Sequence, residues 1–441
     1  MIFINTMDIQ ELYHIYQQHP VITTDSRDCP TGSIFLALKG ETFDGNRFAA
    51  AAIEKGCAYA VIDNPEYQQD ERFILVDDVL QTFKDLAREH RRQFNIPIIA
   101  ITGTNGKTTT KELIAAVLSE KYNTLYTQGN FNNDVGVPKT LFRLTPDHEI
   151  AVIEMGASHP DDIKTLVETV EPTCGLITNV GKAHLQGFGS FEGVMKTKGE
   201  LYDYLKTHDA LVFINGANEH LLEMAQNRDI CRAIEYGTAE GCQVEGEVVS
   251  CAPFLKFEWH SHLFSEKSVY QEVQTHLIGS YNIDNMLAAI AIGLHFGVSP
   301  EQIHHALSNY TPTNNRSQME ETGKNHLIVD AYNANPSSMK AALDNFHVME
   351  VSPKMAILGD MRELGNTSHE EHQHAVNLMK EYGLENVWLV GEEFGKTDCH
   401  YRKFMNVEEV KEAIVNEGVQ GFYILIKGSN STKLWQLPPL L

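Results

Sequence analysis

The chain has 441 residues, of which 42% are hydrophobic and 21% are charged, a composition typical of a globular protein rather than a disordered one. Asp and Glu outnumber Lys and Arg by 59 to 35, giving a net charge of −24. This charge excludes a general binder of nucleic acid or anionic membrane, because such proteins present basic patches. At about 150 residues per domain, the length favours about three domains.

The cysteine pattern and the lack of long apolar runs indicate the cellular compartment of the protein. Seven Cys are scattered without a CxxC pair, which favours a reducing compartment over a disulfide framework or a zinc site. The first residues contain no basic segment followed by an apolar run of signal length. No stretch approaches the roughly 18 apolar residues of a membrane span. We therefore expect a cytoplasmic protein that inserts into no membrane and binds no nucleic acid.

The first segment, residues 1–96, mixes short strands and helices. Strands are expected at Ile34–Leu38 and Ala58–Ile62, and a helix near Phe48–Lys55. A basic helix end precedes Pro97, and we place a domain boundary there. The segment is predicted to be a small α/β domain.

The middle segment, residues 97–312, begins with an apolar run typical of a buried parallel strand, Ile98–Thr102. A glycine loop and an amphipathic helix follow, and the alternation of strands and helices predicts a doubly wound parallel sheet. Residues Gln243–Leu277 are rich in β-forming residues and are expected to form a side hairpin or small sheet. Further expected elements are strands at Ile150–Glu154, Gly175–Asn179 and Leu211–Ile214, and a helix over Ile283–Leu294.

The last segment, residues 313–441, repeats this alternation and predicts a Rossmann-like α/β domain. Asn335-Pro336 is typical of a helix start, with Asn as N-cap and Pro at the first helical position. Strands are expected at His326–Asp330, Met355–Leu358, Val387–Val390 and Phe422–Ile426.

The strongest chemical signal lies between the first strand and first helix of the middle segment, where the chain reads Gly103-Thr104-Asn105-Gly106-Lys107-Thr108-Thr109. Backbone N–H groups of such a loop and of the helix N-terminus point at anionic oxygens. Lys107 adds a cation for the β- and γ-phosphates, and the Thr108 hydroxyl can hold Mg²⁺. The usual pattern has an additional glycine where this chain has Ile101. The strand–loop–helix setting favours a triphosphate site over a plain tight turn.

Two further positions are candidates for holding Mg²⁺, which prefers oxygen ligands. Glu154 ends an apolar strand, and the ligand crevice of parallel sheets lies at the carboxyl ends of the strands. His184 lies in a glycine-rich loop. Taken alone, a solvated glutamate and a surface histidine are the alternative interpretations.

Two polar sites remain open on residue pattern alone. The loop Gly129–Asp134 gathers hydrogen-bonding groups, which suits substrate recognition and ordinary turns equally. Asp330 ends the first strong strand of the last segment, with Arg316 ahead of it. An aspartate there can hold a ribose hydroxyl or cap a helix.

Several motifs, in this order along the chain, resemble those of the Mur ligase family. The opening Asp25-Ser26-Arg27 to Asp44-Gly45 resembles a UDP-binding domain of that family, so the match covers all three segments. The other matching motifs are the phosphate loop at 101–109, Gly129–Pro138 (GNFNNDVGVP), Glu154–Ala157, His184–Gly189, Lys198–Glu200 and Asp330–Pro336 (DAYNANP).

The resemblance implies an ATP-dependent, ADP-forming amide ligase. In this family ATP phosphorylates a substrate carboxylate, and an amine then attacks the acyl phosphate. The motifs are most similar to those of the member that adds D-alanyl-D-alanine to UDP-N-acetylmuramoyl-tripeptide in peptidoglycan precursor synthesis. Either diaminopimelate or lysine is compatible as the third peptide residue. We expect a monomer.

Three alternatives compete with this interpretation. The MurE type, which adds a single amino acid, carries a DNPR motif in its last domain, and no such run occurs in this chain. Folylpolyglutamate synthase-like relatives have no UDP-binding domain. A non-catalytic nucleotide-binding regulator is expected to have lost Glu154, His184 or Lys198, and all three are present.

The resemblance also implies two Mg²⁺ ions, with Thr108 and Glu154 at one and His184 and Lys198 at the other. Lys198 matches a carbamylated lysine of the family, and the resemblance makes Lys107, His184 and Lys198 the catalytic candidates. A carbamate supplies anionic oxygens where an ammonium would repel the metal. Lys196 lies two positions away and so on another face of the expected helix.

The remaining implied contacts are with the nucleotide and the two substrates. Asn282 matches an adenine-side asparagine, although Tyr281 departs from the usual His before it. Arg316 and Asp330 would reach ATP from the last domain. At the uridine end, the implied contacts are those of Ser26, Arg27, Lys39 and Gly40. In the polar loop, Asn132, Asn133 and Asp134 are candidates for contacts with the substrate. The candidates for contacts with the dipeptide are Tyr332 and Asn333.

Overall fold

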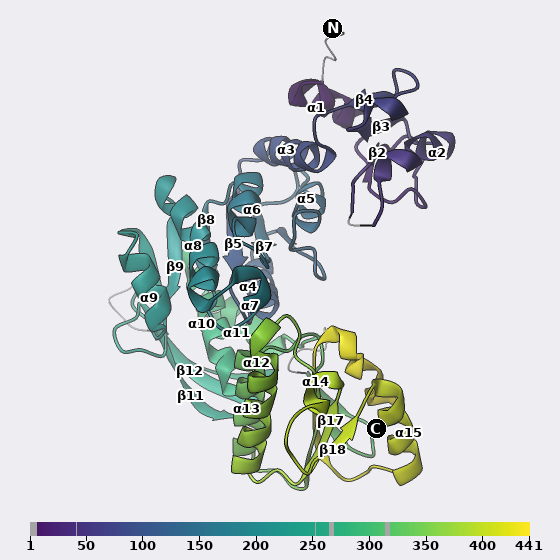
Figure 1. The fold of residues 1–441 in the computed structure, drawn as a ribbon. Helices are drawn as coiled ribbons and strands as arrows, with labels where there is room; N and C mark the ends of the chain where they lie inside the picture. Colours follow the sequence, from purple (N-terminus) through teal and green to yellow (C-terminus); the bar gives the residue numbers. More distant parts are fainter. Residues whose placement is uncertain (1–6, 41, 252, 264–268, 314–317) are drawn as a thin grey trace. The chain divides into compact units, whose positions relative to one another are not determined.

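The computed structural model describes residues 7–40, 42–251, 253–263, 269–313 and 318–441. The chain forms two compact units (Figure 1). The first comprises Met1–Ile98, Leu125–Met155 and Thr165–Pro172, and the second comprises Ile99–Thr124, Gly156–Lys164 and Thr173–Leu441. Among the described residues, no helix is both long enough and apolar enough to cross a membrane.

The first unit contains a parallel sheet in the order β1-β2-β3-β4. Alternate residues of β2 point to opposite faces, as the two-residue period of a strand requires. Ile34 packs with α1 and α3, whereas Phe35 packs with α2. The elements are α1 (Ile9–Gln18), β1 (Ile22–Thr23), β2 (Ile34–Leu36), the 3-10 helix η1 (Gly45–Phe48), α2 (Ala49–Glu54), β3 (Tyr59–Ile62), η2 (Pro65–Tyr67), β4 (Phe73–Leu75) and α3 (Val79–Arg92).

Helix α3 is tied to later parts of the chain within this unit. Arg91 donates to the carbonyl oxygens of Val170 (3.0 Å) and Glu171 (2.9 Å). His90 Nε2 lies 3.1 Å from the Leu144 carbonyl oxygen, and the Phe142 ring stacks on Phe83. These partners come from the later stretches, which also carry β6 (Thr124–Tyr126), α5 (Gly136–Leu141) and β7 (Ile150–Glu154).

The second unit begins with a sheet whose strands run in the order β13-β12-β11-β10-β9-β8-β5. From β5 to β11 the neighbouring strands are parallel. The elements are β5 (Ile98–Thr102), α4 (Lys107–Ser119), β8 (Cys174–Ile177), α7 (Leu185–Phe188), α8 (Phe191–Thr207), β9 (Leu211–Asn215), α9 (Glu219–Gln226), β10 (Ala233–Gly237), β11 (Val244–Cys251), β12 (Phe254–Ser261), β13 (Val269–Ile278), η3 (Ser280–Asn282), α10 (Ile283–His295) and α11 (Pro300–Asn309). Helix α6 (Asp162–Val170) begins in this unit and ends in the first.

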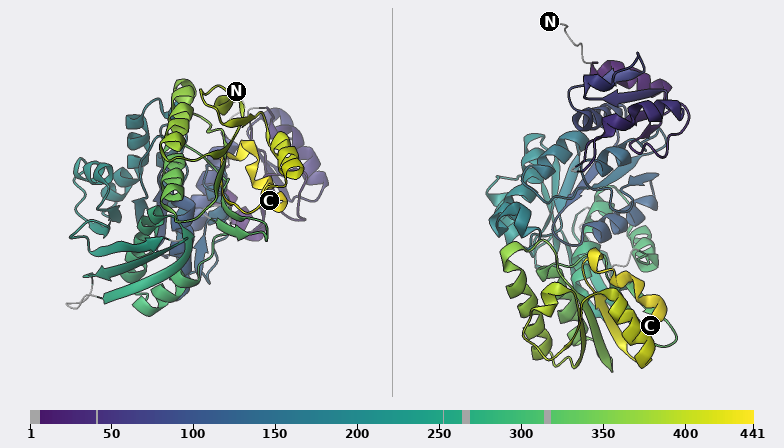
Figure 2. Two further views of the ribbon diagram at one scale, coloured as in Figure 1. Left: turned by 90° about the horizontal axis from the view of Figure 1, so that it is seen from below. Right: turned by 45° about the vertical axis from the view of Figure 1, so that its right-hand side comes forward.

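The side hairpin or small sheet expected over 243–277 is wrong in one respect. The strands form, but β11 pairs with β10, so β11, β12 and β13 extend the larger sheet (Figure 2). On β12, Leu255, Phe257 and Trp259 are fully buried at alternate positions. Such a half-apolar strand needs a covering layer, and α10 packs against β11 and β12 to supply it.

The C-terminal part of the second unit contains a sheet in the order β14-β15-β19-β16-β17-β18, parallel except at β14. Helices α12 and α13 cover one face, and α15 with the C-terminal turns covers the other (Figure 1). The elements are β14 (Gln318–Glu321), β15 (His326–Asp330), α12 (Pro336–Val348), β16 (Lys354–Gly359), η4 (Gly365–Thr367), α13 (Ser368–Glu381), β17 (Asn386–Val390), α14 (Glu392–Gly395), β18 (Arg402–Phe404), α15 (Val407–Glu417), β19 (Tyr423–Lys427), η5 (Asn430–Thr432), η6 (Leu434–Gln436) and η7 (Pro438–Leu440).

The α/β class and the parallel sheets predicted from the sequence are confirmed. Strands β5, β7 and β15 have the expected bounds. The expected start of α12 is also confirmed, because Asn335 caps the helix, its side chain accepts from Ser338 N–H, and Pro336 is the first helical residue.

Candidate nucleotide-binding and ligase site

The phosphate loop lies between β5 and α4, as the sequence predicts. Gly103 has φ 145°, and a Cβ there would lie 1.9 Å from Thr178 Oγ1, so only glycine fits. Gly106 has φ 77° and a Cβ there would lie 2.7 Å from Asn285 Oδ1. Thr108 and Thr109 are buried at the start of α4, and this helix N-terminus suits an anionic group.

Asn105 is held from both sides of the loop. Its N–H donates to Asn179 Oδ1 at 3.0 Å, and its carbonyl oxygen accepts from Thr178 Oγ1 at 2.6 Å and Asn179 Nδ2 at 3.1 Å. Its side chain accepts from Asn335 Nδ2 at 2.7 Å. Since Asn335 is the N-cap of α12, the phosphate loop is bonded directly to the C-terminal part of the chain.

Asn282 lies beneath the loop and points inward. It is 1% exposed; its Nδ2 donates to the Ile278 carbonyl oxygen and its Oδ1 accepts from Asn285 Nδ2, both at 2.8 Å. Asn285 Oδ1 in turn accepts from Thr110 Oγ1 at 2.9 Å. This buried chain of amides and a hydroxyl fixes the first turn of α4 and supports the loop from below.

Lys107 Nζ donates to the carbonyl oxygens of Gly103 (2.8 Å) and Thr104 (3.1 Å). The ammonium is therefore folded over the loop in which anionic phosphates would sit. Phosphate oxygens bind an ammonium more strongly than neutral carbonyls do.

Lys198 is buried on α8, whereas Lys196 is exposed. Burial and, to a smaller extent, the nearby Lys107 lower the pKa of Lys198 to about 7, against the opposing effect of Asp162 and Glu200. Lys198 Nζ lies 5.7 Å from the centre of the Phe188 ring. Lys198 is therefore not a solvated lysine on a helix surface, whereas Lys196 is exposed.

His184 is the residue before α7 and has φ 51°. Its Nδ1 contacts the Glu363 carboxylate, from the loop after β16. Burial lowers the pKa of His184, the contact with Glu363 opposes that shift, and Lys107 and Lys198 add to it. The structure thus places Lys107, His184 and Lys198 within electrostatic reach of one another.

Glu154 belongs to the first unit. It is 1% exposed, its Oε1 accepts from Asn132 Nδ2 at 2.8 Å, and its N–H donates to Thr127 Oγ1 at 3.0 Å. Glu154, a predicted metal ligand, is thus hydrogen-bonded to the polar loop Gly129–Asp134, for which substrate recognition and an ordinary turn were both possible. In that loop, Asn133 Oδ1 accepts from Gly136 N–H at 2.8 Å, which is a local turn contact, and Asp134 is partly buried.

Asp330 at the end of β15 faces Lys427 at the end of β19, with 2.5 Å between Oδ2 and Nζ. The helix-cap alternative for Asp330 is wrong, since Asn335 caps α12. Lys427 is 1% exposed and also donates to the Asn333 carbonyl oxygen at 3.3 Å. Asn333 is exposed, Tyr332 is partly buried, and Arg316 lies outside the described residues.

The residues expected at the uridine end lie on loops of the first unit. Arg27 is 87% exposed and pairs with Asp25 at 2.8 Å, and the Ser26 carbonyl oxygen accepts from Lys55 Nζ at 2.6 Å. Lys39 pairs with Asp63 at 2.8 Å. At Gly40 a Cβ would meet the Phe43 ring at 2.3 Å, so the Phe43 side chain lies directly against this glycine.

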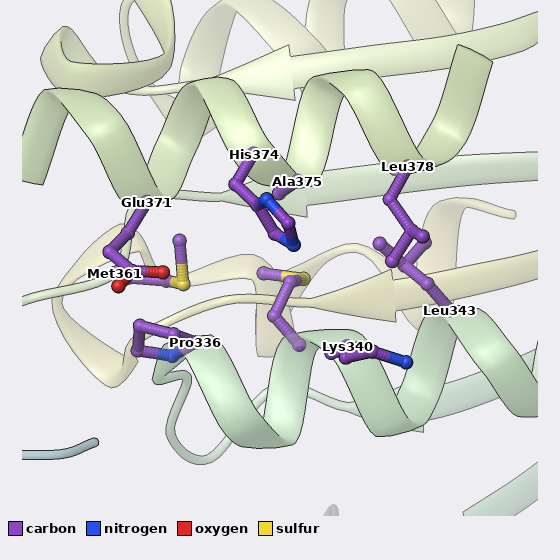
Figure 3. Close-up of a pocket in the computed structure, with 9 residues that line it drawn as sticks. Pro336, Lys340, Leu343, Met361, Glu371, His374, Ala375 and Leu378 are labelled. Carbon is purple, nitrogen blue, oxygen red and sulfur yellow. The ribbon is translucent and has the colours of Figure 1, made fainter. Parts of the chain in front are cut away.

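A small, mostly apolar pocket lies between α12 and α13, apart from the residues above (Figure 3). Met339, Leu343 and Leu378 line it, and Glu371 stands at the end near Met361 and Pro336. Glu371 also pairs with Lys182 at 3.0 Å.

The donor chemistry fits Mg²⁺ in combination with a triphosphate. Among the residues that the structure describes, no group of three or more His, Cys, Asp and Glu could hold a metal by itself. Mg²⁺ is commonly held by one or two carboxylates together with substrate phosphates. The Glu154 carboxylate and the Thr108 hydroxyl are oxygen donors, and Lys198 becomes one only as a carbamate. The His184 imidazole would add a nitrogen donor.

Some residues of the site were missed from the sequence. Thr178 and Asn179, which hold Asn105, directly follow β8, and Lys427 ends β19. A polar residue at the carboxyl end of an apolar strand was the signal used for Glu154 and Asp330, and it applies to these three as well. No local signal singles out Glu363, whose partner is 179 positions away.

Three family models match the chain in sequence order. They are described as Mur ligase family, catalytic domain (residues 20–98), Mur ligase middle domain (residues 101–293) and Mur ligase, glutamate ligase domain (residues 315–430). Together they give the three-domain arrangement that the sequence predicts.

Curated relatives and solved structures resemble the chain over nearly its whole length. UDP-N-acetylmuramoyl-tripeptide–D-alanyl-D-alanine ligase of Bacillus subtilis is 34% identical, with 94% of this chain and 92% of the relative covered. The Escherichia coli enzyme of the same name is also 34% identical, over 94% and 91%. A crystal structure of MurF from Acinetobacter baumannii superposes with a TM-score of 0.88 at 30% identity, covering 98% of each chain.

Proposed function

This chain belongs to the Mur ligase family, and on that premise we propose that it joins D-alanyl-D-alanine to UDP-N-acetylmuramoyl-tripeptide in peptidoglycan precursor synthesis. It is an ATP-dependent, ADP-forming ligase. The observation that carries the proposal is the phosphate loop with Lys107 at the start of α4, in a chain 34% identical over 94% of its length to ligases named for this reaction. The single-amino-acid alternative is not favoured.

The reaction has two steps. An oxygen of the tripeptide's terminal carboxylate attacks the γ-phosphorus of ATP, the bond to the bridging oxygen breaks, and ADP leaves. The amino group of D-alanyl-D-alanine then attacks the acyl carbon, a proton is lost from the nitrogen, and phosphate leaves with the formation of a peptide bond. In both steps negative charge develops on phosphoryl oxygens in the transition state. The rates therefore depend on cations and N–H groups that already face these oxygens.

The chain's residues divide these tasks. Backbone N–H groups of the loop and of the first turn of α4 hold the phosphates, and Lys107 stabilises the charge that develops on the transferred group. Bound Mg²⁺ would neutralise phosphate charge, with Thr108 and Glu154 as ligands of one ion and His184 and carbamylated Lys198 as ligands of a second. Asn282, Arg316 and Asp330 are assigned to the nucleotide. Asn132, Asn133, Asp134, Tyr332 and Asn333 are assigned to the peptide substrates.

The identity of the amine is tested by acceptor preference. With ATP and UDP-N-acetylmuramoyl-tripeptide present, phosphate release should be far faster with D-alanyl-D-alanine than with diaminopimelate, lysine or glutamate. Two observations favour the dipeptide: the relatives are named as D-alanyl-D-alanine ligases, and the chain has no DNPR run. If a single amino acid is used more efficiently than the dipeptide, the proposed amine substrate is wrong, although the assignment to the family is unaffected.

The family resemblance implies that Arg27 contacts the uridine nucleotide, and its guanidinium, which is 87% exposed beside Asp25, is open to such a ligand. Arg27→Ala should raise the KM for the UDP substrate several-fold and leave the KM for ATP nearly unchanged. Arg72→Ala is a matched control, since Arg72 forms the same two-residue pair with Asp70 in the same unit (2.6 Å). Equal changes in both KM values for Arg27→Ala would speak against a contact with the nucleotide.

A further inference from the structure

The loop after β16 touches the loop that carries His184 in the second unit. The Glu363 carboxylate contacts His184 Nδ1, and the Glu363 carbonyl oxygen accepts from Gln186 N–H at 3.3 Å. Glu371 and Lys182 form an ion pair beside them at 3.0 Å. The C-terminal part of the chain therefore reaches the candidate metal ligand His184 through a side chain, and its neighbour Gln186 through the backbone.

The loop that bears Glu363 is anchored by buried groups. Met361 N–H donates to His372 Nε2 at 3.0 Å, and His372 Nδ1 lies 2.6 Å from the Ser368 carbonyl oxygen. Because Nε2 accepts, the His372 proton sits on Nδ1 and donates to that carbonyl. Asp360, also fully buried, accepts from the N–H groups of Glu393 (3.1 Å) and Phe394 (2.9 Å). Glu363 thus extends from a fixed base.

We propose that Glu363 is a positioning residue for His184. An ionised carboxylate only accepts, so the contact places the His184 proton on Nδ1 and leaves the lone pair on Nε2 for a metal ion. Metal-binding histidines whose second nitrogen donates to a carboxylate are oriented by it and made better ligands, and loss of the carboxylate typically costs 10–100-fold in metal affinity. The inference rests on the proposed role of His184 as a Mg²⁺ ligand.

A purely structural pair is the competing explanation. The Glu363 side chain is 54% exposed, and exposed ion pairs contribute little to folding stability. The buried anchors at Asp360 and His372 hold the loop without it. Glu363→Gln should therefore fold normally, so its effect on metal binding can be measured directly.

The test is the affinity of the full-length protein for Mn²⁺ in the presence of a non-hydrolysable ATP analogue, read from the electron paramagnetic resonance signal of free Mn²⁺. Glu363→Gln should weaken binding about tenfold or more. It should also lower kcat without changing the KM for the UDP substrate. Glu371→Gln is the matched control, because it removes the charge from the neighbouring pair with Lys182 and leaves the contact between Glu363 and His184 in place. We expect its Mn²⁺ affinity to stay within about twofold of the unmodified protein.

His184→Ala separates this inference from the proposed function. If His184→Ala weakens Mn²⁺ binding and Glu363→Gln does not, the positioning role is overturned while the metal role stands. Equal losses in Glu363→Gln and Glu371→Gln would also overturn it, since general docking of the loop would then explain both. If His184→Ala binds Mn²⁺ normally, the metal role itself fails. In the double variant His184→Ala/Glu363→Gln we expect no loss beyond that of His184→Ala.

Discussion

Lys107→Ala is expected to lower kcat about a hundred- to a thousandfold, which corresponds to about 2.7–4 kcal/mol of lost transition-state stabilisation. Lys107 lies at the start of α4, and its ammonium already reaches the loop carbonyls of Gly103 (2.8 Å) and Thr104 (3.1 Å). Removing it leaves the transferred phosphoryl group without that cation. Phosphate release under saturating substrates measures the effect.

The control for Lys107→Ala is Lys121→Ala. Lys121 Nζ also donates to two backbone carbonyl oxygens, those of Phe296 (3.2 Å) and Gly297 (2.8 Å), but beyond the other end of α4. Each substitution removes similar hydrogen bonds, so the two should lower the free energy of unfolding by a similar amount, about 1 kcal/mol. Only Lys107→Ala should lose turnover. Near-normal ligation by folded Lys107→Ala would refute the assignment of the loop.

Lys198→Ala is expected to be nearly inactive. Lys198 is 2% exposed, and burial lowers its pKa to about 7, so the neutral amine that reacts with CO₂ is abundant near neutral pH. The ammonium first loses one proton; the neutral amine then adds to the carbon of CO₂ and loses a second proton to give a carbamate. A buried cation would thus become an anion with two metal-binding oxygens. Alanine removes these oxygens. Short carboxylates added to Lys198→Ala should restore part of the activity by supplying them.

Carbamylation has its own readout. In protein equilibrated with ¹³CO₂, a carbamate ¹³C resonance should be present and should disappear in Lys198→Ala. Lys196→Ala should keep both the resonance and most of the turnover, because Lys196 is exposed on another face of α8. An active, CO₂-equilibrated enzyme without the resonance would refute the carbamate.

The parts of the fold that the sequence predicts best are those with strong local patterns. Ile98–Ile101 are all apolar because the strand is buried on both faces, and with Thr102 they form the strand expected. The missed strands include both edge strands of the C-terminal sheet: β14 is Gln-Met-Glu-Glu and β18 is Arg-Lys-Phe. Strands this short and polar show no period, and only pairing with a neighbour makes them strands.

The site divides in a similar way. Lys107, Glu154 and Asp330 stand at the ends of apolar strands or at the start of a helix, so local sequence marks them. The direction in which a side chain points is set by tertiary contacts. The amide of Asn282, for example, is bonded to Ile278 and Asn285 inside the protein, and its role at the adenine side, implied by the family resemblance, stays a prediction. Glu363 could not be found, because its partner is brought near by the fold alone.

The first unit is discontinuous in sequence, and this limits where the chain can be divided. A fragment of residues 1–96 would lack Phe142, which stacks on Phe83 at 5.7 Å between ring centres, and the carbonyl oxygens of Val170 and Glu171 that Arg91 binds. Its α3 would then present apolar and cationic groups without their partners. Modular use of this segment, as a separate uridine-nucleotide sensor or as a small screening target, therefore requires residues 125–172 or a redesigned α3 surface.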